Sequence, residues 1–188
     1  MRLFAALVPP TEAVEHLDAF LEVRRRAADF RWSLAEHLHV TLAFYGDVEE
    51  WRLDEVVERL RSAAARRTPV EIRVAGGGAF PDPAAARVLW AGLEAEPHEE
   101  LERLATGCRT AGAVSGARVD GQRFRPHVTV ARLRRAGHVD DWVRLLDGYR
   151  GPTWRAVSVA LVASHLGQGA RRRPRHEVLE RVEVGSGE

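Results

Sequence analysis

The stretch Leu38-His39-Val40-Thr41-Leu42-Ala43-Phe44 has a close counterpart further along the chain, Pro126-His127-Val128-Thr129-Val130-Ala131-Arg132. Both stretches are predicted to be β-strands, in which successive side chains point to opposite faces. In each copy the histidine and the threonine therefore share one face, while the branched apolar residues form the other, buried face. We expect the two polar faces to meet in one cleft.

The composition describes an ordinary globular chain without a strong overall charge. Its 188 residues are 45% hydrophobic, enough for one compact domain or two small lobes, and the net charge is only +1. Any anion site must therefore be local. All of the basic residues are arginine, a side chain that suits planar phosphate recognition.

Cys108 is the only cysteine, which excludes an internal disulfide and a cysteine-based zinc site and fits a reducing cytoplasm. The apolar residues 1–8 are cut off by Pro9-Pro10, with no signal cleavage pattern or spanning segment after them. We interpret them as a buried strand and expect no membrane attachment.

Apolar spacing along the chain predicts a mixture of helices and strands. Helices are predicted over residues 11–28, from an Asp47 cap onward, from Pro97 and over 139–146; strands are predicted over 30–33, 37–44, 70–74, 87–93, 155–164 and 177–184. Gly76-Gly77-Gly78 lacks the residues of a nucleotide-binding loop and is interpreted as a turn. Helices against largely antiparallel strands indicate an α+β fold.

The two His-x-Thr stretches lie about half the chain apart, and each half is predicted to supply its own helices. This spacing favours a two-lobed, pseudo-symmetric arrangement. A single His-x-Thr would mean little, because so short a motif occurs often by chance. Two copies with the same apolar residues around them point to a site, although two satisfied, half-buried strand histidines would give the same pattern.

The paired motif resembles the 2H phosphoesterase superfamily, and most closely its RNA 2′,3′-cyclic phosphodiesterase, or 2′-5′ RNA ligase, family. Four blocks carry the resemblance: residues 38–46; Gly78-Ala79-Phe80-Pro81 with residues 87–93; residues 125–132; and Ser164-His165-Leu166-Gly167 with residues 177–179. His176 departs from the family, which more often has tyrosine there.

The resemblance implies a fold and an activity. The fold is a single two-lobed domain over residues 1–188, each lobe a mainly antiparallel sheet with helices on its outer face and the active-site cleft between the sheets. The activity is metal-independent hydrolysis of RNA 2′,3′-cyclic phosphate ends to 2′-phosphates, without a cofactor, by a cytoplasmic monomer. The substrates would be RNA ends, including tRNA fragments or small nucleotides.

The chemistry needs one group to accept a proton from water and another to protonate the departing ribose oxygen. Imidazole can do either near neutral pH, so two histidines suffice without a metal. The resemblance makes His39 the proton donor and His127 the proton acceptor, although the residues alone leave these roles interchangeable. Thr41 and Thr129 are placed to bind the non-bridging oxygens of the phosphate.

Arg132 is a further phosphate-binding candidate, because the resemblance places an arginine five residues after the second histidine. Strict alternation would turn Arg132 to the face opposite His127. It can reach the phosphate only if the strand bulges, ends or twists, or if its long side chain bends around.

Other residues leave alternatives open. His37 beside His39 is a weak metal pair, because no carboxylate or cysteine cluster accompanies it. The basic run from Arg171 to Arg175 is either a solvated loop or a contact for an RNA backbone. Phe44, Tyr45, Phe80 and Trp90 are candidates for base stacking, although an aromatic residue in a strand is more often core.

Three alternative functions stay open at this point. Two lie within the superfamily: making or breaking a 2′-5′ linkage, and hydrolysing a small cyclic nucleotide. The third is a non-catalytic RNA-binding module that uses the cleft and the basic loop without turnover.

Overall fold

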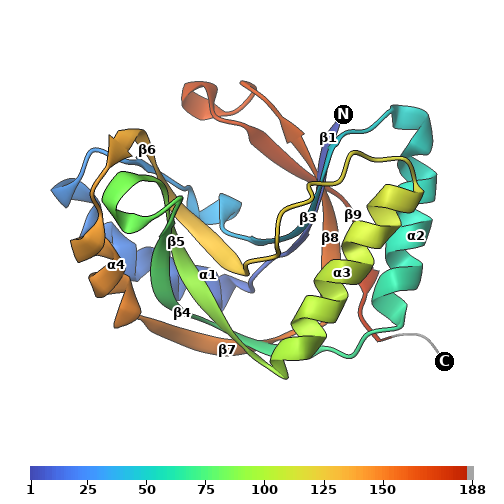
Figure 1. The fold of residues 1–188 in the computed structure, drawn as a ribbon, viewed down its shortest axis with the longest axis horizontal. Helices are drawn as coiled ribbons and strands as arrows, with labels where there is room; N and C mark the ends of the chain where they lie inside the picture. Colours follow the sequence, from blue (N-terminus) through green and yellow to red (C-terminus); the bar gives the residue numbers. More distant parts are fainter. Residues whose placement is uncertain (186–188) are drawn as a thin grey trace.

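The computed structural model describes residues 1–185 as a mixed fold of strands and helices (Figure 1). The strands are β1 Arg2–Leu7, β2 Arg31–Trp32, β3 Val40–Asp47, β4 Val70–Phe80, β5 Ala86–Glu96, β6 His127–Gly137, β7 Arg150–Ala156, β8 Ser158–His165 and β9 Arg175–Glu183. The helices are α1 Thr11–Glu22, α2 Leu53–Ala65, α3 His98–Val114 and α4 Asp140–Asp147. The predicted α+β class is confirmed.

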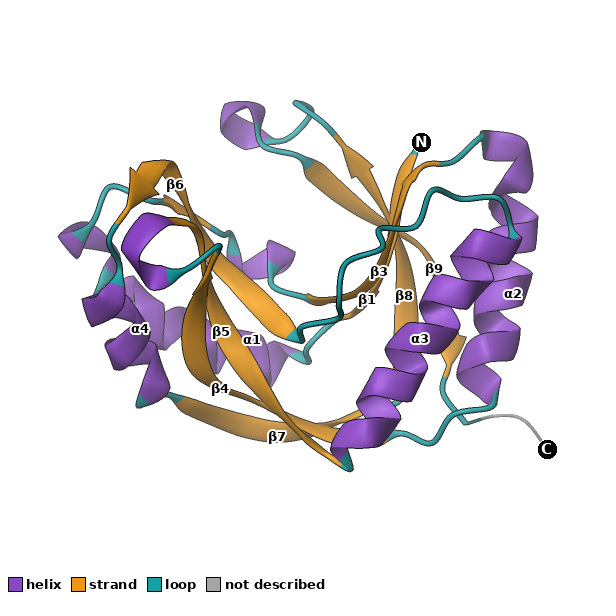
Figure 2. Ribbon diagram, viewed as in Figure 1, coloured by secondary structure: helices purple, strands orange, loops and turns teal. Residues whose placement is uncertain are grey.

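The strands pair antiparallel in the order β7-β4-β5-β6-β3-β1-β8-β9, with β2 alongside β6. Within residues 1–185, β3 and β6 pair at one position, Val40 opposite Val128. The sheet therefore bends there into two lobes: β7, β4, β5, β6 and β2 form the first, and β3, β1, β8 and β9 form the second. Figures 1 and 2 show the two parts facing each other, with α1 and α4 outside the first lobe and α2 and α3 outside the second.

The lobes do not correspond to the two halves of the chain. The helix after β1, α1, crosses to pack against β7 of the first lobe, and α3, which follows β5, packs against β3 of the second. Within residues 1–185 each half of the chain supplies two helices, as expected, but one helix of each half packs on each lobe. Sequence order does not reveal such exchanges, because an apolar helix stripe can pack equally well on either sheet.

The strand predicted over residues 155–164 is two strands with different partners. β7 pairs with β4 in the first lobe, whereas β8 pairs with β1 in the second. Only Val157 separates them, and it is exposed. Because both pieces are extended and adjacent in the sequence, periodicity gives no sign of the change of lobe.

Gly76, Gly77 and Gly78 lie inside β4, so the predicted turn is wrong. Gly76 has a positive φ of 75° at an irregularity in the pairing with β5, a conformation that glycine adopts without strain. Gly78 lies opposite Trp90, and a Cβ added there would come within 2.2 Å of the indole. The absence of a side chain at Gly78 thus lets the Trp90 indole pack closely against β4.

Two helix boundaries differ from the prediction. The first helix ends at Glu22, and residues 25–27 form a separate 3-10 turn. Asp47 is the last residue of β3 and caps no helix, because a 3-10 turn over residues 50–52 precedes α2. The polar residues at both points were compatible with more than one local structure.

A hydrophobic core joins the sheet to its outer helices. Tyr45 of β3 and Cys108 of α3 are both fully buried, and the Tyr45 hydroxyl donates to the Cys108 carbonyl at 2.8 Å. Cys108 is therefore a core residue. None of the helices in the described part of the chain combines the length and apolar character that crossing a membrane requires.

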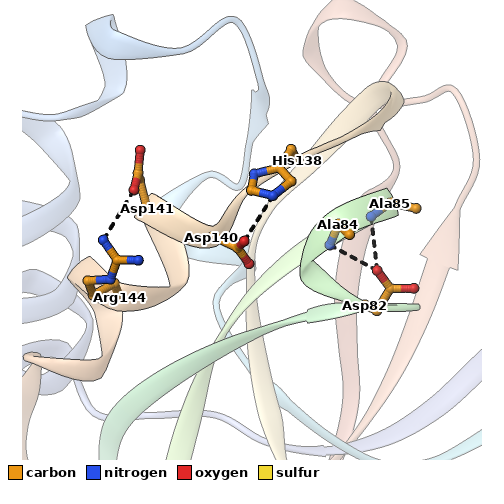
Figure 3. A network of polar contacts seen from close by, with 7 residues as sticks. All are labelled: Asp82, Ala84, Ala85, His138, Asp140, Asp141 and Arg144. Atoms are coloured by element: carbon orange, nitrogen blue, oxygen red, sulfur yellow. Dashed lines mark hydrogen bonds and ion pairs between the residues drawn. The ribbon is translucent and has the colours of Figure 1, made fainter.

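At the far end of the first lobe, polar contacts hold the β4–β5 connection close to the start of α4 (Figure 3). The Asp82 carboxylate accepts from the backbone N–H groups of Ala84 and Ala85 at 2.9 and 3.0 Å, and His138 pairs with Asp140 at 2.9 Å. The Val139 N–H also donates to the Pro83 carbonyl. These contacts fix the end of the hairpin whose first strand carries Phe80.

Candidate active site

The two His-x-Thr stretches meet where the lobes join. Because Val40 lies opposite Val128 in an antiparallel pair, continuing the register by one residue puts His39 opposite Thr129 and Thr41 opposite His127. The two half-sites are therefore related by an approximate twofold axis through the valine pair. The predicted pseudo-symmetry has its origin in this single contact.

Each half-site also contains a β-bulge directly after its threonine. In β3 the pairing with β1 skips from Thr41 to Ala43, and in β6 the pairing with β5 skips from Thr129 to Ala131. A bulge adds one unpaired residue and resets the alternation of the strand. Arg132 consequently returns to the face of His127 and Thr129, which meets the condition under which it can reach a phosphate.

Both imidazoles are held in the same tautomer. His39 Nδ1 lies 2.7 Å from the His37 carbonyl, and His127 Nδ1 lies 2.6 Å from the Arg125 carbonyl. A carbonyl can only accept, so each Nδ1 carries a proton and each Nε2 carries the lone pair when the ring is neutral. His39 Nε2 lies 3.1 Å from the Thr41 hydroxyl.

The predicted site residues His39, Thr41, His127, Thr129 and Arg132 all line one cavity of about 370 Å³. Other lining residues come from β2 and the turn after it and from the loop before β9: Arg31, Trp32, Ser33, Leu34, His37, Arg173, Pro174 and His176. Apart from His37 and the basic loop, the sequence does not point to these residues as part of the site, because their positions depend on tertiary packing. His39 was predicted inside a strand, but it precedes β3, and His37 lies in a 3-10 turn.

Aromatic rings enclose each histidine. The His39 ring packs on Phe4 at 4.9 Å and meets the edge of His176 at 5.5 Å. On the other side, the His127 ring meets Phe80 edge-on at 4.9 Å and Trp90 at 5.9 Å. These contacts restrict rotation of the imidazoles and exclude water from one side of each.

Burial lowers the pKa of both imidazoles below their ordinary value of 6.5. For His39, positive charge on His37, His127 and Arg132 lowers the pKa further, against the opposing effect of the His37 carbonyl. For His127, the Arg125 carbonyl raises the pKa and Arg132 lowers it. Without an anion, both rings are therefore held toward the neutral form near neutral pH.

A third and a fourth histidine adjoin this pair. His176 at the start of β9 packs against His37 with ring centroids 4.5 Å apart. Burial lowers the pKa of His176 to about 4, and His39 and His37 lower it in addition. Among residues 1–185, no three His, Cys, Asp or Glu side chains are arranged as a metal site.

The stacking candidates divide between core and cleft. Tyr45 is core, whereas Phe80 lines a neighbouring cavity of about 550 Å³ that shares His127. Phe44 packs under the Arg2 guanidinium, and Trp90 touches His127 through its ring. Of the four, Phe80 is placed best to meet a base.

A larger cavity, about 850 Å³, lies elsewhere, against α2 and α3. Its charged lining is of mixed sign, and several of those charges pair with one another or with neighbours, such as Arg103 with Glu100. It lacks the imidazoles that distinguish the cavity between the lobes. The candidate active site is therefore the smaller cavity.

Paired imidazoles on facing strands, each beside a threonine and sharing one basic cavity, define the class of the two-histidine phosphoesterases. A family model described as the 2′-5′ RNA ligase superfamily matches residues 9–168. The chain belongs to this superfamily.

The alignments with related proteins cover most of this chain and most of each relative. The chain is 32% identical to an RNA 2′,3′-cyclic phosphodiesterase of Aeropyrum pernix over 80% of the chain and 84% of that protein. It is 30% identical to one from Thermus thermophilus over 98% and 90%. Both proteins are named for the same activity.

Solved structures show the same fold. TT0787 of Thermus thermophilus superposes with a TM-score of 0.78 at 30% identity, covering 100% of both chains. Escherichia coli LigT in complex with 3′-AMP superposes with a TM-score of 0.77 at 25% identity, covering 97% of both. The predicted two-lobed fold is confirmed.

Proposed function

We propose that this protein hydrolyses RNA ends carrying a 2′,3′-cyclic phosphate to 2′-phosphomonoesters, using His39 and His127 as general acid and base. The observation that supports this most strongly is the pair of Nδ1–carbonyl contacts. They leave the Nε2 atom of each ring, one of them beside the Thr41 hydroxyl, to exchange protons at the cavity that both histidines line.

In the proposed reaction His127 Nε2 accepts a proton from a water molecule as the water oxygen bonds to phosphorus. The bond between phosphorus and the ribose 3′ oxygen breaks, and His39 Nε2 donates its proton to that oxygen. The products are a 2′-phosphate and a free 3′ hydroxyl, and the two histidines exchange protonation states. Solvent restores the starting states.

In the proposed mechanism the charge of the transition state is stabilised by Thr41, Thr129 and Arg132. Negative charge grows on the non-bridging oxygens in the transition state, and fixed donors aimed at those oxygens stabilise it. Thr129 and Arg132 reach the cavity from the same strand because of the bulge between them. Bidentate contact with a phosphate is the geometry that suits a guanidinium.

Binding of the substrate favours the protonated form of His39 that the general acid requires. Its phosphodiester anion opposes the burial that holds His39 neutral, so binding favours the protonated ring. Loss of that proton at high pH and protonation of His127 at low pH should give a bell-shaped rate profile.

The names of the relatives support RNA ends with a cyclic phosphate as the substrate, and the 3′-AMP complex of LigT shows that a related protein binds a nucleotide monophosphate. We propose further that residues 1–188 act as one domain, as a monomer and in the cytoplasm. The single cysteine suits that compartment. The proposed chemistry requires no metal and no cofactor.

The test replaces each histidine with asparagine and measures turnover of an oligonucleotide ending in a 2′,3′-cyclic phosphate. His39→Asn and His127→Asn should each lower kcat by roughly 10²–10⁴-fold, while binding of the product persists. His98→Asn is the matched control, because His98 is exposed and its one ion-pair partner within residues 1–185 is Glu102.

Wild-type rates in either variant, or a pH profile with a single limb, would contradict the two-histidine mechanism. A parent protein that binds the oligonucleotide without turning it over would identify an RNA-binding module. Retention of the phosphate on the 3′ oxygen would contradict the proposed direction of cleavage.

A further inference from the structure

A second basic cavity of about 730 Å³ continues from the histidine cavity. The two share Arg31, Arg132 and Arg173. The second cavity is also lined by Arg87, Arg134 and Arg171, with Asp29 as its one acidic residue. We call the surface formed by these six arginines the arginine groove.

Three strands of the first lobe and one loop of the second build the arginine groove. Arg31 of β2 lies directly opposite Arg132 of β6, and Val88 of β5 lies opposite Arg132 on its other side. The loop between β8 and β9 brings Arg171 and Arg173 from the second lobe. An Arg173 guanidinium N–H donates to the Trp32 carbonyl at 2.8 Å and fixes the loop to β2.

The positive charge of the groove is largely uncompensated within the protein. Asp29 lies 4.0 Å from Arg134 and is 92% exposed. In residues 1–185, no carboxylate lies within that distance of the other five arginines. Like charges directly opposite each other on neighbouring strands, such as Arg31 and Arg132, are destabilising. Because the net charge is only +1, this excess is a local feature that a bound anion would relieve.

The backbone conformation of the loop at Arg171 also points to a bound anion. Arg171 and Arg172 both adopt left-handed backbone angles, with φ of 54° and 60°, a conformation that is unfavourable for residues other than glycine. The fold tolerates this strain while presenting the Arg171 side chain to the groove rather than a glycine.

We propose that the arginine groove binds the upstream phosphodiester backbone of a single-stranded RNA whose cyclic end occupies the histidine cavity. The proposal rests on the proposed function for the placement of that end. A cyclic mononucleotide carries only the phosphate that the histidine cavity receives, so it leaves the groove unused. A strand places further phosphates beside the arginines, and the protein should therefore favour oligonucleotides.

The test uses two arginines of the groove that do not line the histidine cavity. The double variant Arg134→Ala, Arg171→Ala removes two charges and keeps the Cβ at each position, so that the loop strain is unchanged. The control Arg61→Ala, Arg66→Ala removes the same charge from α2 and the residue that follows it, on the outer side of the second lobe. Both pairs of arginines are exposed in the folded protein.

Two measurements separate the groove from the chemistry. Turnover is measured with a 2′,3′-cyclic mononucleotide and with a five-nucleotide RNA ending in the same cyclic nucleotide. Binding is measured with the five-nucleotide product, which ends in a 2′-phosphate, and with the corresponding mononucleotide, at several salt concentrations.

The groove variant should bind the five-nucleotide RNA about 2- to 30-fold more weakly, because two exposed ion pairs to phosphates are lost and their effects multiply. Its salt dependence should flatten by about 1.4 in the slope of log K against log salt, or about 0.7 for each phosphate that an arginine no longer neutralises. Turnover of the mononucleotide should match the parent, and the control variant should match it with every ligand.

Equal losses with mononucleotide and oligonucleotide, or oligonucleotide binding equal to that of the control, would overturn the proposal. If the proposed function is wrong, the parent protein will turn over neither substrate. The binding experiment does not require turnover, so it would still test whether the groove binds RNA. Tighter binding of the mononucleotide than of the strand would also contradict a backbone site.

Discussion

Replacing Gly78 with alanine tests whether the glycine run of β4 serves the active site. The added Cβ would lie 2.2 to 2.7 Å from three atoms of the Trp90 indole, whereas ordinary contacts begin near 3.5 Å. The indole must therefore move by roughly 1.3 Å. Since Trp90 touches both His127 and Phe80, the displacement is passed to the proposed base.

The expected magnitude follows from this overlap. Overpacking of this kind lowers the free energy of unfolding by about 1–3 kcal/mol, and an error of about 1 Å in a catalytic group can lower the rate by about 10²-fold. Urea unfolding measures the first quantity and turnover of a cyclic-phosphate oligonucleotide measures the second. Gly121→Ala is the control, because nothing lies within 4 Å of a Cβ there.

A second substitution shows whether the indole is responsible. Trp90→Phe in the Gly78→Ala background replaces the indole with a smaller ring. No hydrogen bond is lost, because the buried Trp90 Nε1 has no partner in the described structure. The double variant should regain a large part of the activity. If Gly78→Ala behaves like Gly121→Ala in both assays, the reasoning that links β4 to His127 is refuted.

Three further predictions concern stability and are measured by urea unfolding. The pKa of His176 is lowered to about 4 in the folded protein from 6.5, so its stabilising contribution is complete above about pH 6.5 and is lost as the pH falls toward 4; an unfolding midpoint unchanged between pH 7 and 4.5 would contradict this. Tyr45→Phe should lower the free energy of unfolding by about 0.5–1.5 kcal/mol, because it removes the buried bond to Cys108. Gly107→Ala should raise it by up to about 1 kcal/mol, because the new Cβ meets Ala63 at 3.5 Å, an ordinary contact inside a helix.

The sequence predicts the elements that depend on local periodicity. The pairing of His39 with Thr41 and of His127 with Thr129 on one face follows from strand alternation alone, and all four residues line one cavity. The position of Arg132 does not follow, because it depends on a bulge that only the pairing of β5 with β6 creates.

Other features of the site could not be predicted from the sequence, because they depend on contacts between segments that are distant along the chain. Glycines usually mark turns, but Gly78 is needed where an indole from the neighbouring strand lies over the backbone. His176 and Arg173 reach the cavity from a loop that is distant in sequence from both motifs. Nothing in their local sequence separates them from the solvated residues around them.

The near-identity of the two half-sites implies that their own hydrogen bonds cannot set the roles of acid and base. Each imidazole has the same tautomer, because each donates Nδ1–H to the carbonyl two residues before it. The ring neighbours differ: His39 packs near the imidazoles of His37 and His176, whereas His127 packs against Phe80 and Trp90. Arg132 lowers the pKa of both histidines. If His39 is the acid, it holds its proton against these neighbours only when the phosphodiester supplies negative charge. The acid would then be assembled by the substrate, and the arginine groove, by holding a longer strand, would favour that assembly for RNA ends over isolated nucleotides.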